Sequence, residues 1–184
     1  MATSRAPGSA VSASAAAPAH RPPHPIIPTR IISLPAAWAA RWAAAPDRAV
    51  LHTPTTGWLT GGDLLGRTAA AAAALANLGL RAGDRVLTSG ASTAELVITH
   101  VAALRLGLTV VPVNTAFAPN EIANVAAESG APVAVLDDPS RLTGGPRTIT
   151  PHELVWGGFA PESGANPPHE LDATTPDDPA MLVF

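Results

Sequence analysis

Few of the residues that commonly carry chemistry stand close together in this chain. His20 and His24 have a spacing that suits a metal ion, but they lie in a proline-rich stretch without further ligands, so we interpret them as tail residues. The acid pairs Asp137-Asp138 and Asp177-Asp178 each adjoin a proline, and acids beside proline at loop edges more often form turns. Neither group of residues predicts a metal centre.

Isolated polar residues near predicted strands are the remaining candidates. The loop TSGAS at 88–92 follows a strand, where α/β proteins bind nucleotides, but its one glycine, Gly90, falls short of the three in a dinucleotide fingerprint. His100 lies inside an apolar helix and is interpreted as a packed histidine, and Asn114 follows a strand and is interpreted as a turn residue. The sequence therefore assigns no residue to a catalytic, cofactor-binding or metal-binding role.

The residue types that are absent exclude several mechanisms. The 184 residues contain no cysteine, and all 11 basic residues are arginines, so a Walker-type lysine, a Schiff base and cysteine-ligated zinc are excluded within this chain. The formal net charge of −3 and the scattered arginines do not favour nucleic-acid binding. Apolar stretches are too short to span a membrane, and the N-terminus lacks the apolar segment of a secretory signal, so we expect a cytoplasmic protein.

The elements that would position any site begin after an N-terminal tail. Residues 1–29 are rich in Ala, Pro and Ser and are predicted to be disordered. A helix is predicted over 34–45, with two tryptophans four residues apart on one face that favour packing over ligand binding. A hairpin with strands at 48–52 and 58–60 follows.

Strands and helices then alternate, which predicts an α/β fold with a parallel sheet made of βαβ units. Capping-box patterns at Thr60–Asp63 and Ser92–Glu95 open the first two helices, and Pro119 begins the third. Strands are predicted at 85–88, 108–111 and 132–136, and the core-facing residues of the second helix are predicted to be Val97, Val101, Leu104 and Leu108. This α/β segment covers residues 30–138.

The remaining residues are less regular. Residues 139–176 are rich in proline and glycine and predict an irregular connection, with one helical turn at 150–156. Residues 177–184 predict a turn followed by a buried strand at Met181–Phe184. Because a buried strand needs neighbours on both sides, we expect that further chain normally follows it.

Three stretches, in this order, resemble adenylate-forming enzymes of the acyl-CoA synthetase superfamily. The segment GWLTGGDLLGRTAAAAAALANLGLRAGDRV resembles their "LTY-x-EL" helix that ends in "LG-x-x-x-GDRV". The segment LRLGLTVVPVNTAFAPNEIANVAAESGAPVAVLD resembles their "L-x-x-GA-x-x-VP-(L/I)(N/D)" block. Gly61 replaces the usual aromatic residue, Leu108 the usual Ala, and Ala118 a frequent Thr, which leaves the local packing at these positions open.

The resemblance carries expectations about fold and function. It implies the incomplete N-terminal segment of the large domain, because PDDPAMLVF resembles the strand that leads into the phosphate loop, which would begin after Phe184. It further implies an ATP-dependent acid–CoA ligase active in fatty acid metabolism, with ATP, Mg and CoA as cofactors of the full-length enzyme and a small carboxylic acid as substrate. The residues Asn114–Phe117 (NTAF) resemble the "NTAY" of malonyl-CoA synthetases.

Because the phosphate loop and the catalytic lysine of the family lie outside residues 1–184, the resemblance implies that this chain is inactive alone. Two other interpretations stay open. One is a non-enzymatic remnant that acts as an interaction or regulatory module. The other is an independent nucleotide-binding α/β domain, which the glycine-poor loop and the missing lysine disfavour.

Overall fold

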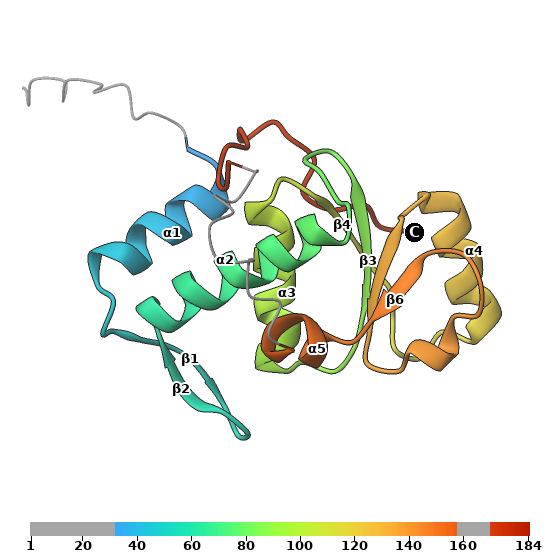
Figure 1. The fold of residues 1–184 in the computed structure, drawn as a ribbon, viewed down its shortest axis with the longest axis horizontal. Helices are drawn as coiled ribbons and strands as arrows, with labels where there is room; N and C mark the ends of the chain where they lie inside the picture. The colour runs from blue at the N-terminus through green and yellow to red at the C-terminus, as the bar shows by residue number, and fades with distance from the viewer. Residues whose placement is uncertain (1–31, 158–169) are drawn as a thin grey trace, which may run out of the picture. The chain divides into compact units, whose positions relative to one another are not determined.

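The computed structural model describes residues 32–157 and 170–184, and Figure 1 shows their elements. The predicted tail, with His20 and His24, lies outside the described residues. The helices are α1 Leu34–Ala44, α2 Gly61–Asn77, α3 Ala94–Arg105, α4 Pro119–Ser129 and α5 Pro151–Trp156, with a 3-10 turn, η1, at Pro139–Arg141. The strands are β1 Ala49–Thr53, β2 Gly57–Thr60, β3 Arg85–Ser89, β4 Thr109–Pro112, β5 Val133–Leu136 and β6 Arg147–Ile149.

The predicted α/β fold with a parallel sheet is confirmed. Strands β3 to β6 form a four-stranded sheet in the order β4-β3-β5-β6, and each neighbouring pair is parallel. Strands β1 and β2 pair as the predicted antiparallel hairpin. Since β3 and the two strands beside it are mostly buried, they carry buried apolar residues on both faces of the sheet.

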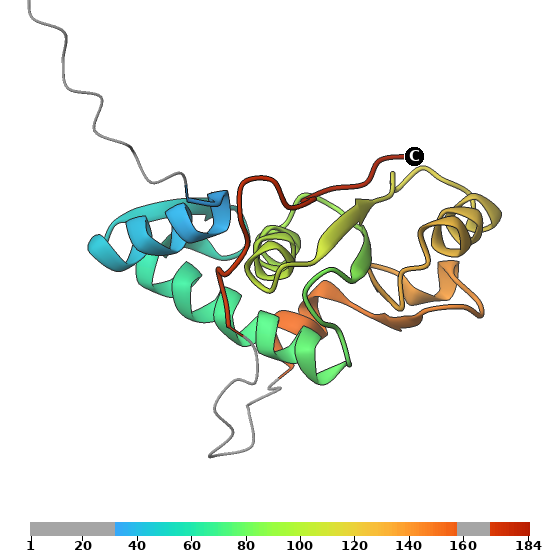
Figure 2. The same cartoon turned by 90° about the horizontal axis from the view of Figure 1, so that it is seen from above.

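Each face of the sheet has its own layer of helices. Val86, Val110 and Val133 pack in one cluster with α1, α2, α3 and α5. Leu87 and Val111 belong to a second cluster with residues of α4. Figure 2 shows α4 on the side of the sheet away from α1, α2 and α3.

The predicted start of α2 is confirmed in detail. The backbone N–H of Thr60 donates to Asp63 Oδ2 over 2.9 Å, and the backbone N–H of Asp63 donates to Thr60 Oγ1 over 3.2 Å. These two bonds satisfy groups that the first turn of a helix otherwise leaves unpaired. The predicted α4 is also confirmed, with Ile122 and Val125 buried and Gly130 in a left-handed conformation at its end.

The predicted core face of α3 was correct only in part. Leu108 is buried, and Val101 and Leu104 are partly buried and pack against the core, but Val97 does not. The capping residue is Thr93, whose Oγ1 accepts from the backbone N–H of Leu96, so the helix begins one residue later than the Ser92 pattern predicts. Val97 is 41% exposed, whereas Ile98 and Ala102 are fully buried. The sequence of α3 is apolar almost all round, and a helix of this kind has no single stripe from which to read a core face.

The segment predicted to be irregular contains one strand that the sequence analysis missed. Strand β6 is three residues long and pairs with β5 at the edge of the sheet. Its residues Arg147 and Thr148 are not buried, so it lacks the apolar run by which a strand is recognised. The helical turn at 150–156 is confirmed as α5, which Thr150 and Glu153 cap.

The predicted buried strand at Met181–Phe184 was also wrong. Only Met181 forms a β-bridge, with Val110 of β4, and the side chains of Met181, Val183 and Phe184 are 50%, 72% and 53% exposed. Because β4 is the edge strand of the sheet, this segment has a strand neighbour on one side only within the described residues. An apolar run therefore lies against the sheet without being enclosed by it.

Candidate functional site

The carboxyl ends of the parallel strands are the place to look for a ligand site in this kind of sheet. A pocket of about 290 Å³ lies there, and we refer to it as the carboxyl-edge pocket. The loops after β3, β5 and β6 and the first turns of α3 and α5 supply its lining residues, which are Thr93, Glu95, Asp137, Thr150, Pro151 and His152. The pocket thus brings two carboxylates and an imidazole to one place.

Asp137 closes the TSGAS loop after β3. The backbone N–H of Ala91 donates to Asp137 Oδ2 over 2.5 Å. A Cβ atom on Gly90 would overlap the same carboxylate, so any larger residue here would displace the Asp137 side chain from the loop. A phosphate would need a free backbone N–H in this loop. The N–H of Ala91 is already bonded to a protein carboxylate, which argues against a phosphate-cradling role for the loop.

Glu95 connects the pocket to α5 and α2. Trp156 Nε1 donates to Glu95 Oε1 over 3.0 Å, and the Arg67 guanidinium lies 4.0 Å from the centre of the Trp156 ring. Burial raises the pKa of Glu95, but hydrogen bonds from Trp156, backbone and Thr93, with the nearby His152, outweigh it and lower the pKa below 4.5. Glu95 is therefore ionised at neutral pH.

The lowered pKa of Glu95 predicts a pH-dependent contribution to stability. A carboxyl with a lower pKa in the folded state stabilises the fold above its unfolded pKa, here 4.5, and this contribution is lost as the pH falls through the folded pKa. We expect Glu95→Gln to be less stable than the parent chain at neutral pH, with the difference closing in acid. Urea unfolding of both chains from about pH 7 to pH 3 measures this difference. A difference in the free energy of unfolding that does not change with pH would show that the charge of Glu95 contributes nothing to stability.

The other polar candidates lie apart from this pocket and act in local structure. Asn114 Oδ1 accepts from the backbone N–H of Ala116, and Asp138 Oδ1 accepts from that of Ser140, so both form turns as interpreted from sequence. His100 is half-buried, and its burial lowers its pKa, which keeps it neutral at neutral pH. Within residues 32–157 and 170–184, no cluster of three or more potential metal ligands is found.

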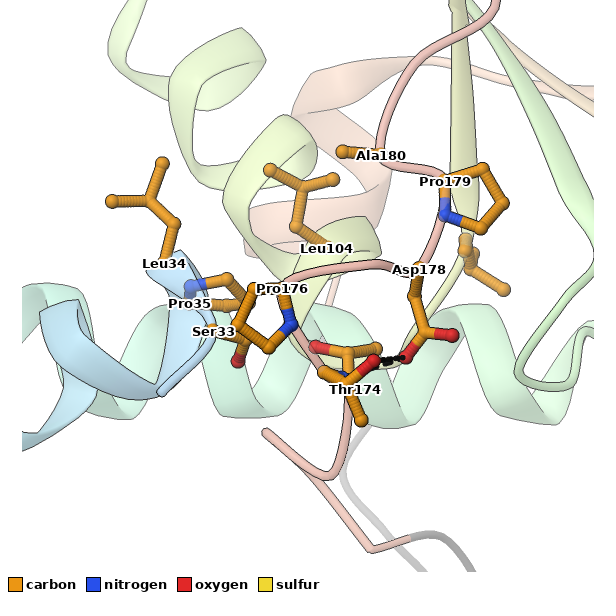
Figure 3. A pocket seen from close by; sticks show the side chains of 11 residues that line it. Ser33, Leu34, Pro35, Leu104, Thr174, Pro176, Asp178, Pro179 and Ala180 are labelled. Atoms are coloured by element: carbon orange, nitrogen blue, oxygen red, sulfur yellow. Dashed lines mark hydrogen bonds between the residues drawn. The ribbon is translucent and has the colours of Figure 1, made fainter. Parts of the chain in front are cut away.

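A second, smaller pocket of about 110 Å³ lies between the start of α1, helix α3 and residues 174–180 (Figure 3). Among the described residues, no group pairs with its buried Ser33 Oγ or with Thr174 Oγ1. Buried hydroxyls of this kind ordinarily bond water, for which the pocket has room. Its walls are otherwise apolar and proline-rich, so it offers no charged group for a substrate apart from Asp178, which is bonded to Thr175.

Comparison with known proteins defines the class. Residues 38–184 match the AMP-binding enzyme family, and this chain belongs to that family. No curated protein sequence is similar enough to this chain to count as a match. Within the described residues, no helix has both the length and the apolar character needed to cross a membrane.

Solved structures that are similar to this chain include adenylation enzymes. The N-terminal subdomain of Klebsiella oxytoca NpsA, in complex with 3-hydroxybenzoyl-AMSN, is 26% identical with a TM-score of 0.72, over 86% of this chain and 39% of its own. The artificially fused NpsA-ThdA adenylation–PCP di-domain, also from K. oxytoca, is 26% identical with a TM-score of 0.73, over 84% and 28%. O-succinylbenzoate Coenzyme A synthetase (MenE) from Bacillus subtilis, in complex with AMP, is 24% identical with a TM-score of 0.59, over 64% and 32%, and shows the fold alone.

The chain thus spans 39% of the length of the NpsA subdomain structure that it matches. Its match confirms the N-terminal adenylate-forming architecture that the sequence motifs predicted.

The sequence analysis missed the bond between Ala91 and Asp137 in the carboxyl-edge pocket, because it joins residues 46 positions apart and no local pattern signals it.

Proposed function

We propose that these residues form the N-terminal part of an ATP-dependent acid–CoA ligase. The observation that carries this proposal is the match to an adenylation subdomain over 86% of the chain, in the same region as the family match. Asn114 supports a free-standing ligase, because peptide-synthetase adenylation domains usually carry Asp at the position that this residue matches. In the proposed enzyme, the role of this chain is structural. Its sheet and helices support the C-terminal segment that lies against β4 at the edge of the sheet.

The proposed reaction has two steps. A carboxylate oxygen of the acid attacks the α-phosphate of ATP, and pyrophosphate leaves, which gives an acyl-adenylate. The thiol of CoA then attacks the acyl carbon, and AMP leaves. The charge on the transferred phosphate needs backbone N–H groups, a lysine and Mg²⁺. Since this chain contains no lysine, that residue would come from outside residues 1–184.

The proposal predicts that the 184-residue chain does not bind ATP. Isothermal titration calorimetry of the chain with ATP and Mg²⁺ checks this, and a dissociation constant in the micromolar range would contradict it.

A second test uses the DNA that follows the Phe184 codon, translated in three forward frames. A Ser/Thr/Gly-rich loop ending in Pro-Lys-Gly would support the ligase, whereas unrelated sequence would favour a non-enzymatic interaction module.

The substrate is proposed to be a small carboxylic acid. The resemblance of residues 114–117 to malonyl-CoA synthetases suggests malonate as the first acid to test. Acid-dependent exchange of pyrophosphate into ATP, measured for an enzyme that carries these residues together with the loop, identifies the acid. Use of longer fatty acids with malonate inactive would remove the malonate proposal. Thioester formation on CoA but not on a carrier protein would distinguish a CoA ligase from an adenylation domain.

A further inference from the structure

Residues 170–182 form a segment that we call the strap. In Figure 1 it is drawn in dark red and runs from beside α3 to the edge of the sheet at β4. Both of its attachments are made to one corner of the fold, where α3 ends and β4 begins. Arg105 at the end of α3 holds one part of the strap, and Thr109 and Val110 of β4 hold the other.

The first attachment is an ion pair with matched geometry. Arg105 Nε donates to Asp172 Oδ1 over 3.0 Å, and Arg105 Nη2 donates to Asp172 Oδ2 over 2.9 Å. The backbone N–H of Asp172 also donates to the carbonyl of Arg105 over 2.8 Å. The two side chains are only 5% and 19% exposed, so solvent screens this pair less than a surface pair.

Arg105 is itself held in place by α2. Its Nη1 donates to Thr68 Oγ1 over 2.7 Å and to the carbonyl of Leu65 over 3.0 Å. An arginine that a neighbouring helix holds in place presents its remaining donors in one direction, so it specifies where a carboxylate binds as well as attracting it. The guanidinium is therefore a fixed point for the strap.

The second attachment aligns the strap with β4. The backbone N–H of Val110 donates to the carbonyl of Ala180 over 3.0 Å, and that of Leu182 donates to the carbonyl of Val110 over 2.9 Å. Thr109 Oγ1 donates to the carbonyl of Pro179 over 3.2 Å. Between the attachments, Asp178 Oδ2 accepts from the backbone N–H of Thr175 over 2.6 Å, which closes a turn and shortens the strap.

We propose that Arg105 and Asp172 are positioning residues that set the register of Ala180–Leu182 against β4. A shift by one residue would move the Met181 side chain and the Leu182 side chain each to the other side of the sheet, and two backbone bonds alone specify register weakly. The ion pair fixes the strap eight positions before Ala180, and the turn takes up the length between them. What this register does for the enzyme rests on the proposed function, in which Ala180–Leu182 lead toward the phosphate loop.

Asp172→Asn is the matched variant for the test. Asp172 has a φ of 63°, a left-handed conformation that Asn adopts readily, so the change removes the charge and keeps the backbone geometry. Hydrogen exchange of the Leu182 and Val110 amides, followed by NMR, is the readout. We expect both to exchange at least tenfold faster, since the change weakens charge-assisted hydrogen bonds that hold the strap and makes its local opening easier.

The control variant is Arg85→Met, which removes a 2.6 Å hydrogen bond to the carbonyl of Ser129 away from the strap. It should leave the Leu182 amide unchanged. Exchange at Leu182 and Val110 that stays within twofold in Asp172→Asn would overturn the proposal. So would an equal increase across β3 and β5, because that would show general destabilisation and no effect on register.

The outcome separates this inference from the proposed function. Faster exchange at Leu182 supports the positioning role whether or not a ligase activity is found. For an enzyme that carries these residues with the phosphate loop, Asp172→Asn should raise the KM for ATP in pyrophosphate exchange. If no acid supports exchange in the parent enzyme, the proposed function fails while the amide result still decides the role of the ion pair.

Discussion

Replacing Arg105 with methionine is expected to lower the free energy of unfolding by about 3 kcal/mol, since removal of one partner of a buried ion pair leaves the other uncompensated. Methionine keeps much of the length of the side chain but none of its donors. Asp172, Thr68 Oγ1 and the carbonyl of Leu65 would each lose a hydrogen bond. Urea unfolding followed by tryptophan fluorescence measures the change, with the slope m expected to stay the same.

Two further variants test the cause of this loss. Arg85→Met removes an exposed arginine, and it should lower the free energy of unfolding by less than about 1 kcal/mol. The double variant Arg105→Met with Asp172→Asn should be more stable than the sum of the single effects predicts, because it leaves no unpaired charge. Strict additivity, or a loss below about 1 kcal/mol for Arg105→Met, would contradict a buried pair of this importance.

Local features of the fold were predictable from the sequence because their causes are local. The bonds between Thr60 and Asp63 join residues three positions apart, and Pro119 and Gly130 mark the ends of α4 by their own backbone preferences. The order of strands and helices followed in the same way from short apolar runs between turn residues. The family motifs added the assignment to a class, which the family match confirms.

The features that the sequence did not reveal depend on distant residues. Arg105 looks like a surface residue in the last turn of a helix, and only the fold shows it buried against a carboxylate 67 positions away. Asp137 was interpreted as a turn residue, but its carboxylate occupies the β3 loop. Strand β6 is too short and polar to be recognised without β5 beside it. In each case the interaction partner, and not the residue type, decides the role.

The candidate site was predictable to a similar degree. The sequence placed Asn114 after a strand and the acid pairs at loop edges, and the structure shows Asn114 and Asp138 bonded to their own turns. It did not predict that Glu95, Asp137 and His152 line one pocket, since they follow three different strands. Parallel sheets bring such loops together only once the strand order is known.

Replacing Gly61 with alanine is expected to destabilise the chain by about 1–3 kcal/mol, as overpacking of a close contact does. A Cβ atom at this position would lie 2.9 Å from the carbonyl oxygen of Ala45 and 3.1 Å from that of Trp42. These are backbone atoms at the end of α1, so they cannot rotate away as a side chain would. The aromatic residue that the family usually carries here would require the end of α1 to move, which accounts for glycine in this chain.

Gly66→Ala is the matched control, because Gly66 lies in the same helix and a Cβ atom there meets nothing within 4 Å. In an open helical position, alanine in place of glycine should stabilise the chain by about 0.5–1 kcal/mol. Opposite signs for the two variants in thermal or urea unfolding would show that α1 packs against α2 through the backbone at Gly61. A stabilising Gly61→Ala would mean that the end of α1 is free to move, and the close approach would then not explain the missing aromatic residue.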